Sequence, residues 1–276
     1  MLLIDANNLF YKCYSINNSS ISSIIRLFVS MISSLITQKN NIGNNYNVFI
    51  IWDTEFLLWR KELYKTYKAN RINKFETKEE MEKFFNSRIE LRKYIYNFTV
   101  YRQIMLNHFE ADDIIAYYVR KYIEFFSNEP IIICSNDKDF QQLLRKECPT
   151  VIMRRWGMKK KIYTITDFIE QYGITPDLWS SVKSLAGDSG DNVPGVYGIG
   201  EKRALDVVKK YGHVLEWIDK DIKEDNSVEY RWIKKIKANT QVKLYFKLVD
   251  LEYNHSMIKI EINKCNTFKW IQQDIL

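Results

Sequence analysis

Three short apolar runs that each end at an aspartate constrain the fold of this chain more than any other feature. The runs are "LLID" ending at Asp5, "FIIWD" ending at Asp53 and "IIICSND" ending at Asp137. Short, continuous apolar runs are typical of strands that are buried on both faces of a sheet. Segments with helical apolar spacing separate the runs, at 21–38, 77–98 and 109–126. This alternation predicts an α/β fold with a mainly parallel central sheet and helices on both faces.

Local signals refine this prediction. Thr77 is a plausible helix N-cap, with Glu80 three residues later. A short helix is expected over 140–144, and "TVIMRRWGMKKKIYTIT" has a strand, turn and strand pattern with Gly157 in the turn. From Thr166 the pattern is mostly helical, which predicts a helical subdomain packed on one end of the sheet.

Length and cysteine usage favour a cytoplasmic globular protein. The chain has 276 residues, enough for a sizeable core. No apolar run reaches membrane-spanning length, and the first residues lack the pattern of a secretion signal, so we expect no membrane partner. The four cysteines form no CxxC pair and are expected to be reduced thiols: Cys13, Cys134, Cys148 and Cys265.

The acidic residues are candidate metal ligands. Because functional groups gather at the carboxyl ends of parallel strands, the strand-end aspartates are expected at one edge. Glu110 and Asp113 lie three residues apart and so share a helix face. The candidate ligand set is Asp5, Asp53, Glu110, Asp112, Asp113, Asp137, Asp139, Asp188 and Asp191.

Each of these acids alone is more often a turn residue, a helix cap or a macrodipole partner. Together they would repel one another strongly unless cations lay between them. No His or Cys cluster accompanies them, so all-oxygen ligation indicates Mg²⁺ or Mn²⁺ rather than zinc. Two such ions about 4 Å apart can activate water and stabilise the leaving oxygen of a phosphodiester.

The rest of the chain is strongly basic. The formal net charge is +7 and the sequence pI is about 9.0 although nine acids are assigned to one site. An acidic pocket within a basic surface suits a polyanion that is held and cut.

Two basic segments are candidate nucleic-acid contacts. In "NVPGVYGIGEKRA", glycines lead into a helix start whose exposed N–H groups could hold a phosphate, although an ordinary helix–turn–helix is the plain alternative. In 59–74, aromatic residues are interleaved with cations. This pattern suits single-stranded nucleic acid, whose bases stack on the rings, and it equally suits a solvated basic helix whose rings pack on the core. The candidate contacts are Lys65, Tyr67, Gly195, Gly198, Ile199, Gly200, Lys202 and Arg203.

Five pieces of the sequence resemble one family in their order along the chain. They are "LIDANN", "YKANR", "EADD", "SNDKDFQQLL" and "LAGDSGDNVPGVYGIGEKRA", from Leu3 to about Tyr211. This set resembles the structure-specific 5′ nucleases, which include flap endonucleases, phage 5′-3′ exonucleases and the 5′ nuclease domain of bacterial DNA polymerase I. The tail after about Ile222 matches no motif of this family.

The resemblance implies a flap-endonuclease (PIN-like) fold with a helical arch and a helix-3-turn-helix. The expected division is an α/β nuclease core over 1–165, including an arch at about 55–98, and a helical subdomain over 166–276. The helix-3-turn-helix is expected at about 176–212, followed by C-terminal helices.

The resemblance also implies a division of labour in the site. Around the first ion it places Asp5, Asp53, Glu110, Asp112 and Asp113, and around the second Asp137, Asp139, Asp188 and Asp191. Lys68 and Arg71 match the residues at the arch base that contact the scissile phosphate. The glycine turn is expected to bind duplex backbone, with K⁺ as a further ion there.

The implied partner is DNA with a 5′ flap, overhang or nick, or an RNA–DNA hybrid, bound by a monomer. We expect it in a bacterial or phage-infected cell, with an organelle as the open alternative. Alternatives are a single-stranded RNA nuclease, which would not need the turn at 187–212, and a non-catalytic DNA-binding protein, which would not need nine carboxylates. A phosphatase with an aspartyl-phosphate would want a DxD pair after the first strand, where the chain has Asp5-Ala6-Asn7.

Overall fold

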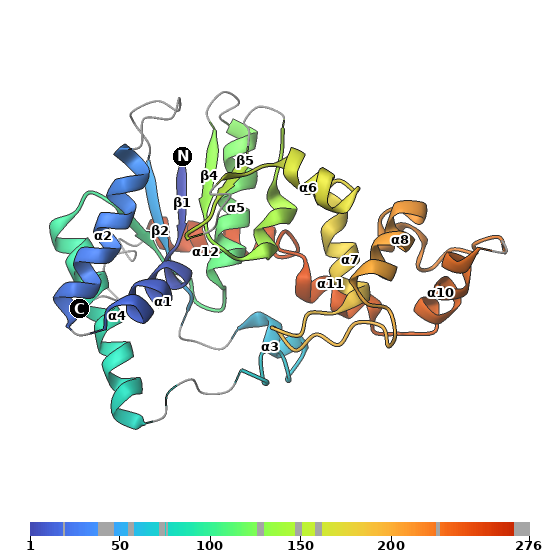
Figure 1. Cartoon of the computed structure of the whole chain (residues 1–276), viewed down its shortest axis with the longest axis horizontal. Helices are drawn as coiled ribbons and strands as arrows, with labels where there is room; N and C mark the ends of the chain where they lie inside the picture. Colours follow the sequence, from blue (N-terminus) through green and yellow to red (C-terminus); the bar gives the residue numbers. More distant parts are fainter. Residues whose placement is uncertain are drawn as a thin grey trace.

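A six-stranded sheet forms the centre of the computed structural model (Figure 1). The structure describes residues 1–18, 20–37, 47–54, 58–71, 75, 77–125, 130–146, 151–157, 162–224 and 227–267, with the backbone alone at 125 and 263–267. The strands are β1 (Leu2–Asp5), β2 (Val48–Ile51), β3 (Arg102–Ile104), β4 (Ile131–Cys134), β5 (Val151–Arg154) and β6 (Ile162–Tyr163). Their order is β3-β2-β1-β4-β5-β6, and only the β5–β6 pair is antiparallel. The predicted mainly parallel sheet is confirmed.

Helices cover both faces of this sheet. Alternation along β1 sends Leu2 and Ile4 to one face and Leu3 to the other. On the first face lie α1 (Ala6–Ile16), α2 (Ile21–Thr37) and α4 (Lys78–Phe98); on the second lie α5 (Ala111–Phe125) and α12 (His255–Thr267). The chain therefore has the layered α/β architecture that the alternation of strands and helices predicts.

Several local predictions hold in the structure. The Thr77 side chain caps α4 by accepting from the Glu80 N–H at 3.1 Å. The short helix after β4 is a 3-10 helix, η1 (Lys138–Leu143). Gly157 has a φ of 65°, as a turn requires, and the flanking strands pair antiparallel. The sequence patterns missed α1 and the edge strand β3.

The predicted arch falls partly outside the described residues. Its described parts are the short helix α3 (Trp59–Leu63), a turn over 64–71, Phe75 and α4. Residues 55–57, 72–74 and 76 lie outside them. No helix among the described residues is both long enough and apolar enough to cross a membrane.

The second half of the chain is helical and extends from one end of the sheet (Figure 1). It contains α6 (Ile165–Tyr172), η2 (Pro176–Leu178), α7 (Trp179–Ala186), α8 (Glu201–Tyr211), α9 (Val214–Trp217), α10 (Val228–Lys237) and α11 (Val242–Val249). α7 packs against α8 and α11, α10 packs against α8, and α12 returns to α5. One hydrophobic core runs through both halves, and our division at residue 166 stays a prediction.

Candidate active site

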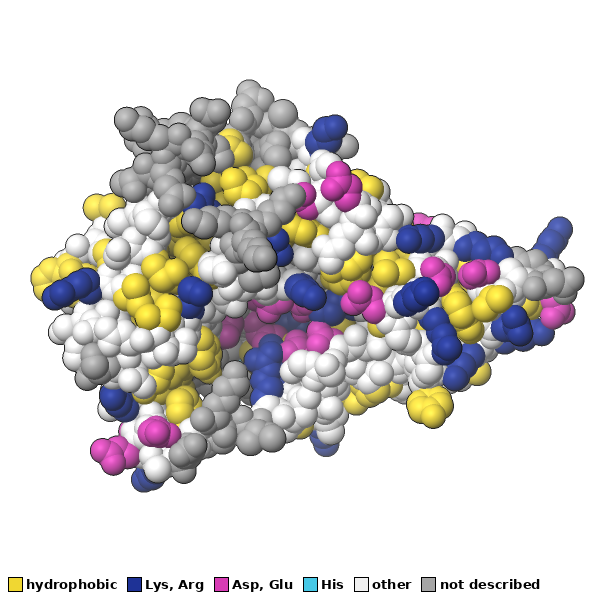
Figure 2. Space-filling model, viewed as in Figure 1, with side chains coloured by type: hydrophobic (Ala, Val, Ile, Leu, Met, Phe, Trp, Pro, Cys, Tyr) yellow, Lys and Arg dark blue, Asp and Glu magenta, His cyan; other side chains and the backbone are white. Residues whose placement is uncertain are grey.

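Four carboxylates meet at the edge of the sheet where three neighbouring strands end. Asp5 ends β1, Asp53 follows β2 and Asp137 follows β4, while Asp112 lies in the first turn of α5. Burial and then the charge of Asp53 raise the pKa of Asp5 to about 7. Burial also raises the pKa of Asp112 well above its ordinary value, and Asp137, Asp5 and Asp53 add to that effect. Figure 2 shows acidic side chains lining a hollow in the middle of the molecular face that it presents.

Glu110 lies beside these carboxylates, but protein donors already satisfy it. Its Oε2 accepts from Arg60 and from the Tyr67 hydroxyl, each at 3.0 Å, and its Oε1 accepts from Lys68. Burial alone would raise the pKa of Glu110, but Lys68 and Arg60 hold it below the ordinary value. Glu110 therefore links the arch base to the cluster.

Asp113 pairs with a buried arginine, Arg60, which it shares with Glu110. Arg60 donates to both Asp113 oxygens, at 2.8 and 2.7 Å, and Trp59 Nε1 donates at 3.1 Å. Asp113 is 1% exposed and lines neither of the two cavities described below. Both Asp113 oxygens are thus occupied by an ion pair that supports the site from behind, and its predicted role as a metal ligand stays a prediction.

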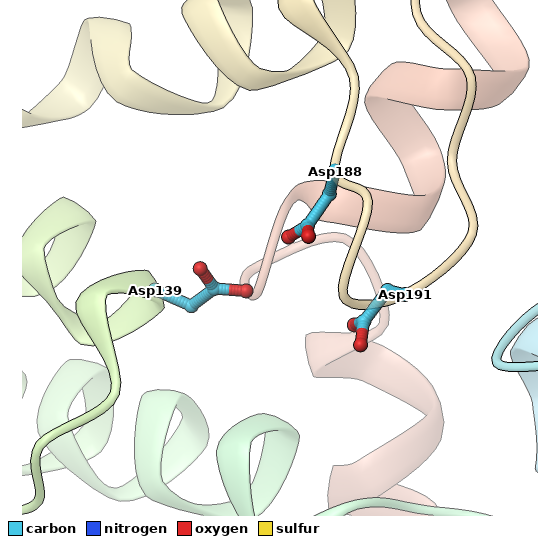
Figure 3. A group of neighbouring side chains, drawn as sticks. All are labelled: Asp139, Asp188 and Asp191. Atoms are coloured by element: carbon cyan, nitrogen blue, oxygen red, sulfur yellow. The ribbon is translucent and has the colours of Figure 1, made fainter. Parts of the chain in front are cut away.

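A second group of carboxylates comes from η1 and from residues 187–193, which we call the carboxylate loop. Asp139, Asp188 and Asp191 each offer an oxygen, and these atoms lie within 4.8 Å of one another (Figure 3). Among the described residues, no other three His, Cys, Asp or Glu ligand atoms lie as close together. The four carboxylates at the strand ends, which we call the strand-end group, are thus more widely spaced than this second group.

Lys183, on α7, lies between two members of this group. Its Nζ pairs with Asp139 and lies 2.5 Å from Asp188 Oδ2. The pKa of Asp139 is nevertheless raised to about 6, because burial and the charge of Asp137 together outweigh the lowering effect of Lys183. A cation of the protein itself therefore already lies among these acids.

The arch base contacts the carboxylate loop directly. Burial opposes the charge on Lys68, but Glu110 and Asp191 hold its pKa above the ordinary value. Lys68 Nζ lies 3.6 Å from Asp191 Oδ2, and Arg71 donates to Asp191 Oδ1 at 2.6 Å. Tyr67 donates its hydroxyl to Asp191 at 2.7 Å. The structure thus brings both predicted phosphate contacts to the carboxylates.

Two cavities of about 520 and 790 Å³ open over these groups. The smaller is lined by the second group, and the larger by the strand-end group with Tyr11 and Phe75. Both cavities are lined by Asn8, Lys68, Arg71, Asp112, Asp137 and Gly190. A phosphodiester that enters here would therefore meet carboxylates and cations together.

The glycine turn between α7 and α8 has two kinds of glycine. Gly195 has a φ of 66°, and a Cβ atom added to it would lie 2.3 Å from the Gly187 backbone nitrogen. Gly200 instead has an ordinary φ of −83°, and a Cβ there would meet nothing within 4 Å. The fold therefore requires Gly195, whereas no atom of the described residues comes close enough to require a glycine at position 200.

The structure corrects two of the predicted DNA contacts. Tyr67 is 2% exposed and packs with Val193 and Tyr245, so its ring cannot stack on a base. Ile199 is 2% exposed, and its N–H donates to Val196 within the turn, so it holds no free donor for a phosphate. The side chains of Lys65, Lys202 and Arg203 are exposed, as a nucleic-acid contact requires.

Sequence reasoning missed Lys183 and the role of Arg60. Lys183 is the one cation of α7 and stands five residues before Asp188, which is the signal that could have drawn attention to it. Arg60 belongs to the basic segment 59–74, yet it is 1% exposed and also donates to the Leu248 carbonyl of α11.

Comparisons with known proteins place the chain among 5′-3′ exonucleases. The family models "5′-3′ exonuclease, N-terminal resolvase-like domain" and "5′-3′ exonuclease, C-terminal SAM fold" match residues 1–173 and 174–273. A 5′-3′ exonuclease of Mycoplasmopsis pulmonis is 30% identical over 275 residues, covering 95% of this chain and 86% of that protein. One of Buchnera aphidicola is 28% identical over 265 residues, covering 95% and 87%.

The fold also matches a solved structure over nearly its whole length. The flap endonuclease of bacteriophage T5, in a pseudo-enzyme–product complex with DNA and metal ions, superposes with a TM-score of 0.77 at 23% identity. The match covers 99% of this chain and 97% of that one. With both family models and a relative at 30% identity in agreement, the chain belongs to the 5′-3′ exonuclease family of nucleases.

Proposed function

We propose that the chain hydrolyses phosphodiester bonds near the 5′ ends of branched or duplex DNA with the help of two divalent ions. The observation that carries this proposal is the convergence of Asp139, Asp188 and Asp191 beside Lys68. The T5 relative that was solved with DNA and metal ions supports it. The expected settings are replication or repair, including removal of RNA primers.

The residues present fit Mg²⁺ or Mn²⁺. All donors in both groups are carboxylate oxygens, which hard divalent ions prefer. The raised pKa values of Asp5, Asp112 and Asp139 show that burial and mutual repulsion disfavour their charged forms when only protein cations are near. We assign one ion to Asp139, Asp188 and Asp191, and the other to the strand-end group with Asp112. Asp137, a member of the strand-end group, also raises the pKa of Asp139, so it lies near the second group as well.

Divalent ions bound at such a site supply a hydroxide nucleophile near neutral pH and stabilise charge on the leaving oxygen. The protein's own part is to position and neutralise the phosphate. Lys68 stays protonated and lines both cavities, so it can donate to an oxygen of a phosphate bound there. A donor that the protein already holds in place is most effective in such a site. Arg71 is 57% exposed at the side chain and can hold the same or the next phosphate.

The α7–turn–α8 unit is the proposed duplex-binding element. Gly200 leaves open space at the start of α8, where no side chain caps the helix. Backbone N–H groups and the exposed Lys202 and Arg203 can contact phosphates there without reading bases. A K⁺ ion at the turn is proposed on the family resemblance, and a K⁺ titration of duplex binding tests it.

The partner is proposed to be DNA with a 5′ flap, an overhang or a nick, or an RNA–DNA hybrid. We further propose that the protein acts as a monomer in the cytoplasm.

A cleavage assay on three substrates tests this function. With Mg²⁺, a labelled 5′-flap duplex should be cut faster than a blunt duplex or a single strand. Lys68→Ala should lower the single-turnover rate on the flap by roughly 10²-fold or more while affinity changes little. Equal rates on all three substrates would contradict the structure-specific activity, and a loss of affinity alone in Lys68→Ala would contradict the role of Lys68.

A further inference from the structure

α10 brings a lysine directly beside the glycine turn. Lys235 lies on the exposed side of this helix, whose other side buries Ile233 and Ile236 in the core. A Cβ atom added to Gly198 would lie 2.9 Å from the Lys235 Nζ atom. The same ammonium lies 4.9 Å from the centroid of the Tyr197 ring, which is 90% exposed. α10 belongs to none of the five sequence motifs, and yet it reaches the turn.

Arg203 of α8 converges on the same glycine. Its Nη1 donates to the Gly198 carbonyl at 2.5 Å, and its Cζ lies 5.6 Å from the centroid of the Trp232 ring of α10. Aromatic rings attract cations through their negative faces. Tyr197 therefore restrains Lys235, and Trp232 restrains Arg203, so that two cations are held close to one point of the turn.

These cations are not neutralised by the described part of the protein. The neighbouring Lys234 pairs with Glu224 at 2.8 Å. Glu201, the acid in the first turn of α8, lines the cavity that also holds Asp188. Among the described residues, no ion pair forms at Lys202, Arg203, Arg231 or Lys235. Figure 2 shows Lys and Arg side chains gathered over the end of the molecule that α8 and α10 form.

We propose that Lys235 and Arg203 together bind the sugar-phosphate backbone of duplex DNA, and that α10 thereby extends the duplex-binding surface beyond α8. A cation without a carboxylate partner gains the most binding free energy from a polyanion, because it gives up only bound water and no ion pair. Counterions are released from the DNA when it binds. The contact is to the backbone, so it is independent of base sequence. This inference rests on the proposed function, since it takes DNA as the substrate.

Equilibrium binding of a 5′-flap duplex tests the role of Lys235. The measurement is made in EDTA, so that bound DNA is not cut, over a range of salt concentrations. Lys235→Gln should weaken binding by roughly fivefold near 0.1 M salt and should reduce the slope of log K against log salt by about 0.9, as one lost phosphate contact predicts. Lys235→Arg, which keeps the charge, should restore both quantities.

The matched control lies one residue away on the same helix. Lys234→Gln removes a lysine that is already paired with Glu224, so it should leave the affinity and the salt slope unchanged. A Lys235→Gln protein with the salt slope of wild type, or an equal effect of Lys234→Gln, would overturn the inference. Wild-type cleavage of the flap with Mg²⁺ is measured alongside. If wild type cuts and Lys235→Gln binds normally, this inference alone fails, whereas a wild type that neither binds nor cuts DNA contradicts the proposed function.

Discussion

The backbone N–H of Lys68 donates to the carbonyl oxygen of Asp191 at 2.9 Å, which joins the arch base to the carboxylate loop. Both segments turn sharply at this point. Lys68 has a φ of 56° and Asn192 a φ of 59°, a region that residues other than glycine seldom occupy. Asn192 also donates its side-chain amide to the Thr66 carbonyl at 2.7 Å. Each segment thus holds the other in the conformation that brings Lys68 to the carboxylates.

Two substitutions at Asn192 separate its backbone from its side chain. Asn192→Gly keeps the left-handed backbone and loses the bond to Thr66, so it should reduce the free energy of unfolding by about 1 kcal/mol. Asn192→Ala should lose roughly 1 kcal/mol more, because alanine disfavours this φ. Urea unfolding measures both, and the single-turnover cutting rates should fall in the same order. An alanine variant as stable and as active as wild type would show that the two segments are not coupled.

Asp113 should behave as a structural residue rather than as a metal ligand. Asp113→Ala leaves the buried Arg60 with Glu110 as its remaining carboxylate partner, and breaking such a buried pair should cost about 3 kcal/mol or more of stability. Asp188→Ala, on the cavity wall, should cost less than this, because it removes the bond to the Gly190 N–H and the pair with Lys183, which keeps Asp139 as its other carboxylate partner. Denaturant unfolding of the two variants would contradict this assignment if Asp188→Ala proved the more damaging change.

The stability of the metal-free protein should fall as the pH rises from about 5 to 8. Asp5 has an ordinary pKa of 3.8 and a folded-state value of about 7. Between these values the folded state binds more protons than the unfolded state, so each increase in pH costs stability. Asp139, raised to about 6, acts in the same direction. Added Mg²⁺ should therefore raise the melting temperature more at pH 8 than at pH 5, and equal stabilisation at both would count against a metal site at these acids.

Gly195 and Gly200 should differ in what their substitution affects. Gly195→Ala would force a side chain against the Gly187 backbone and should destabilise the fold. In Gly200→Val the added Cβ atom meets no described atom within 4 Å, so this change should lower the melting temperature less than Gly195→Ala and yet weaken binding to duplex of any sequence. Binding to a single strand should change less. Equal weakening on both substrates would contradict the assignment of the turn to the duplex.

The layers of the fold follow from local patterns, whereas individual side-chain roles do not. β1, β2 and β4 are continuous apolar runs because both of their faces are covered. β3 has only three residues and begins with an exposed Arg102 at the sheet edge, so it leaves no such run.

The aspartates at strand ends could be predicted because parallel topology alone brings them together. The environment of Tyr67 could not, since it depends on packing against Tyr245 and Val249, which lie 178 and 182 residues further along the chain. Arg60 differs from the exposed cations around it only because α11 and the start of α5 enclose it. Lys183 likewise gains its role from the tertiary approach of Asp139.

The most direct test of the account is the single-turnover cutting of a labelled 5′-flap duplex by wild type and by Asp188→Ala, with Mg²⁺ and with EDTA. Wild type should cut with Mg²⁺ and stop in EDTA, because the carboxylates themselves supply no nucleophile. Asp188→Ala should cut at least roughly 10²-fold more slowly with Mg²⁺, since it removes one of the three carboxylates, with Asp139 and Asp191, whose oxygens lie closest together. Its duplex affinity should stay near that of wild type. Undiminished cutting in EDTA, or a wild-type rate for Asp188→Ala, would contradict the account.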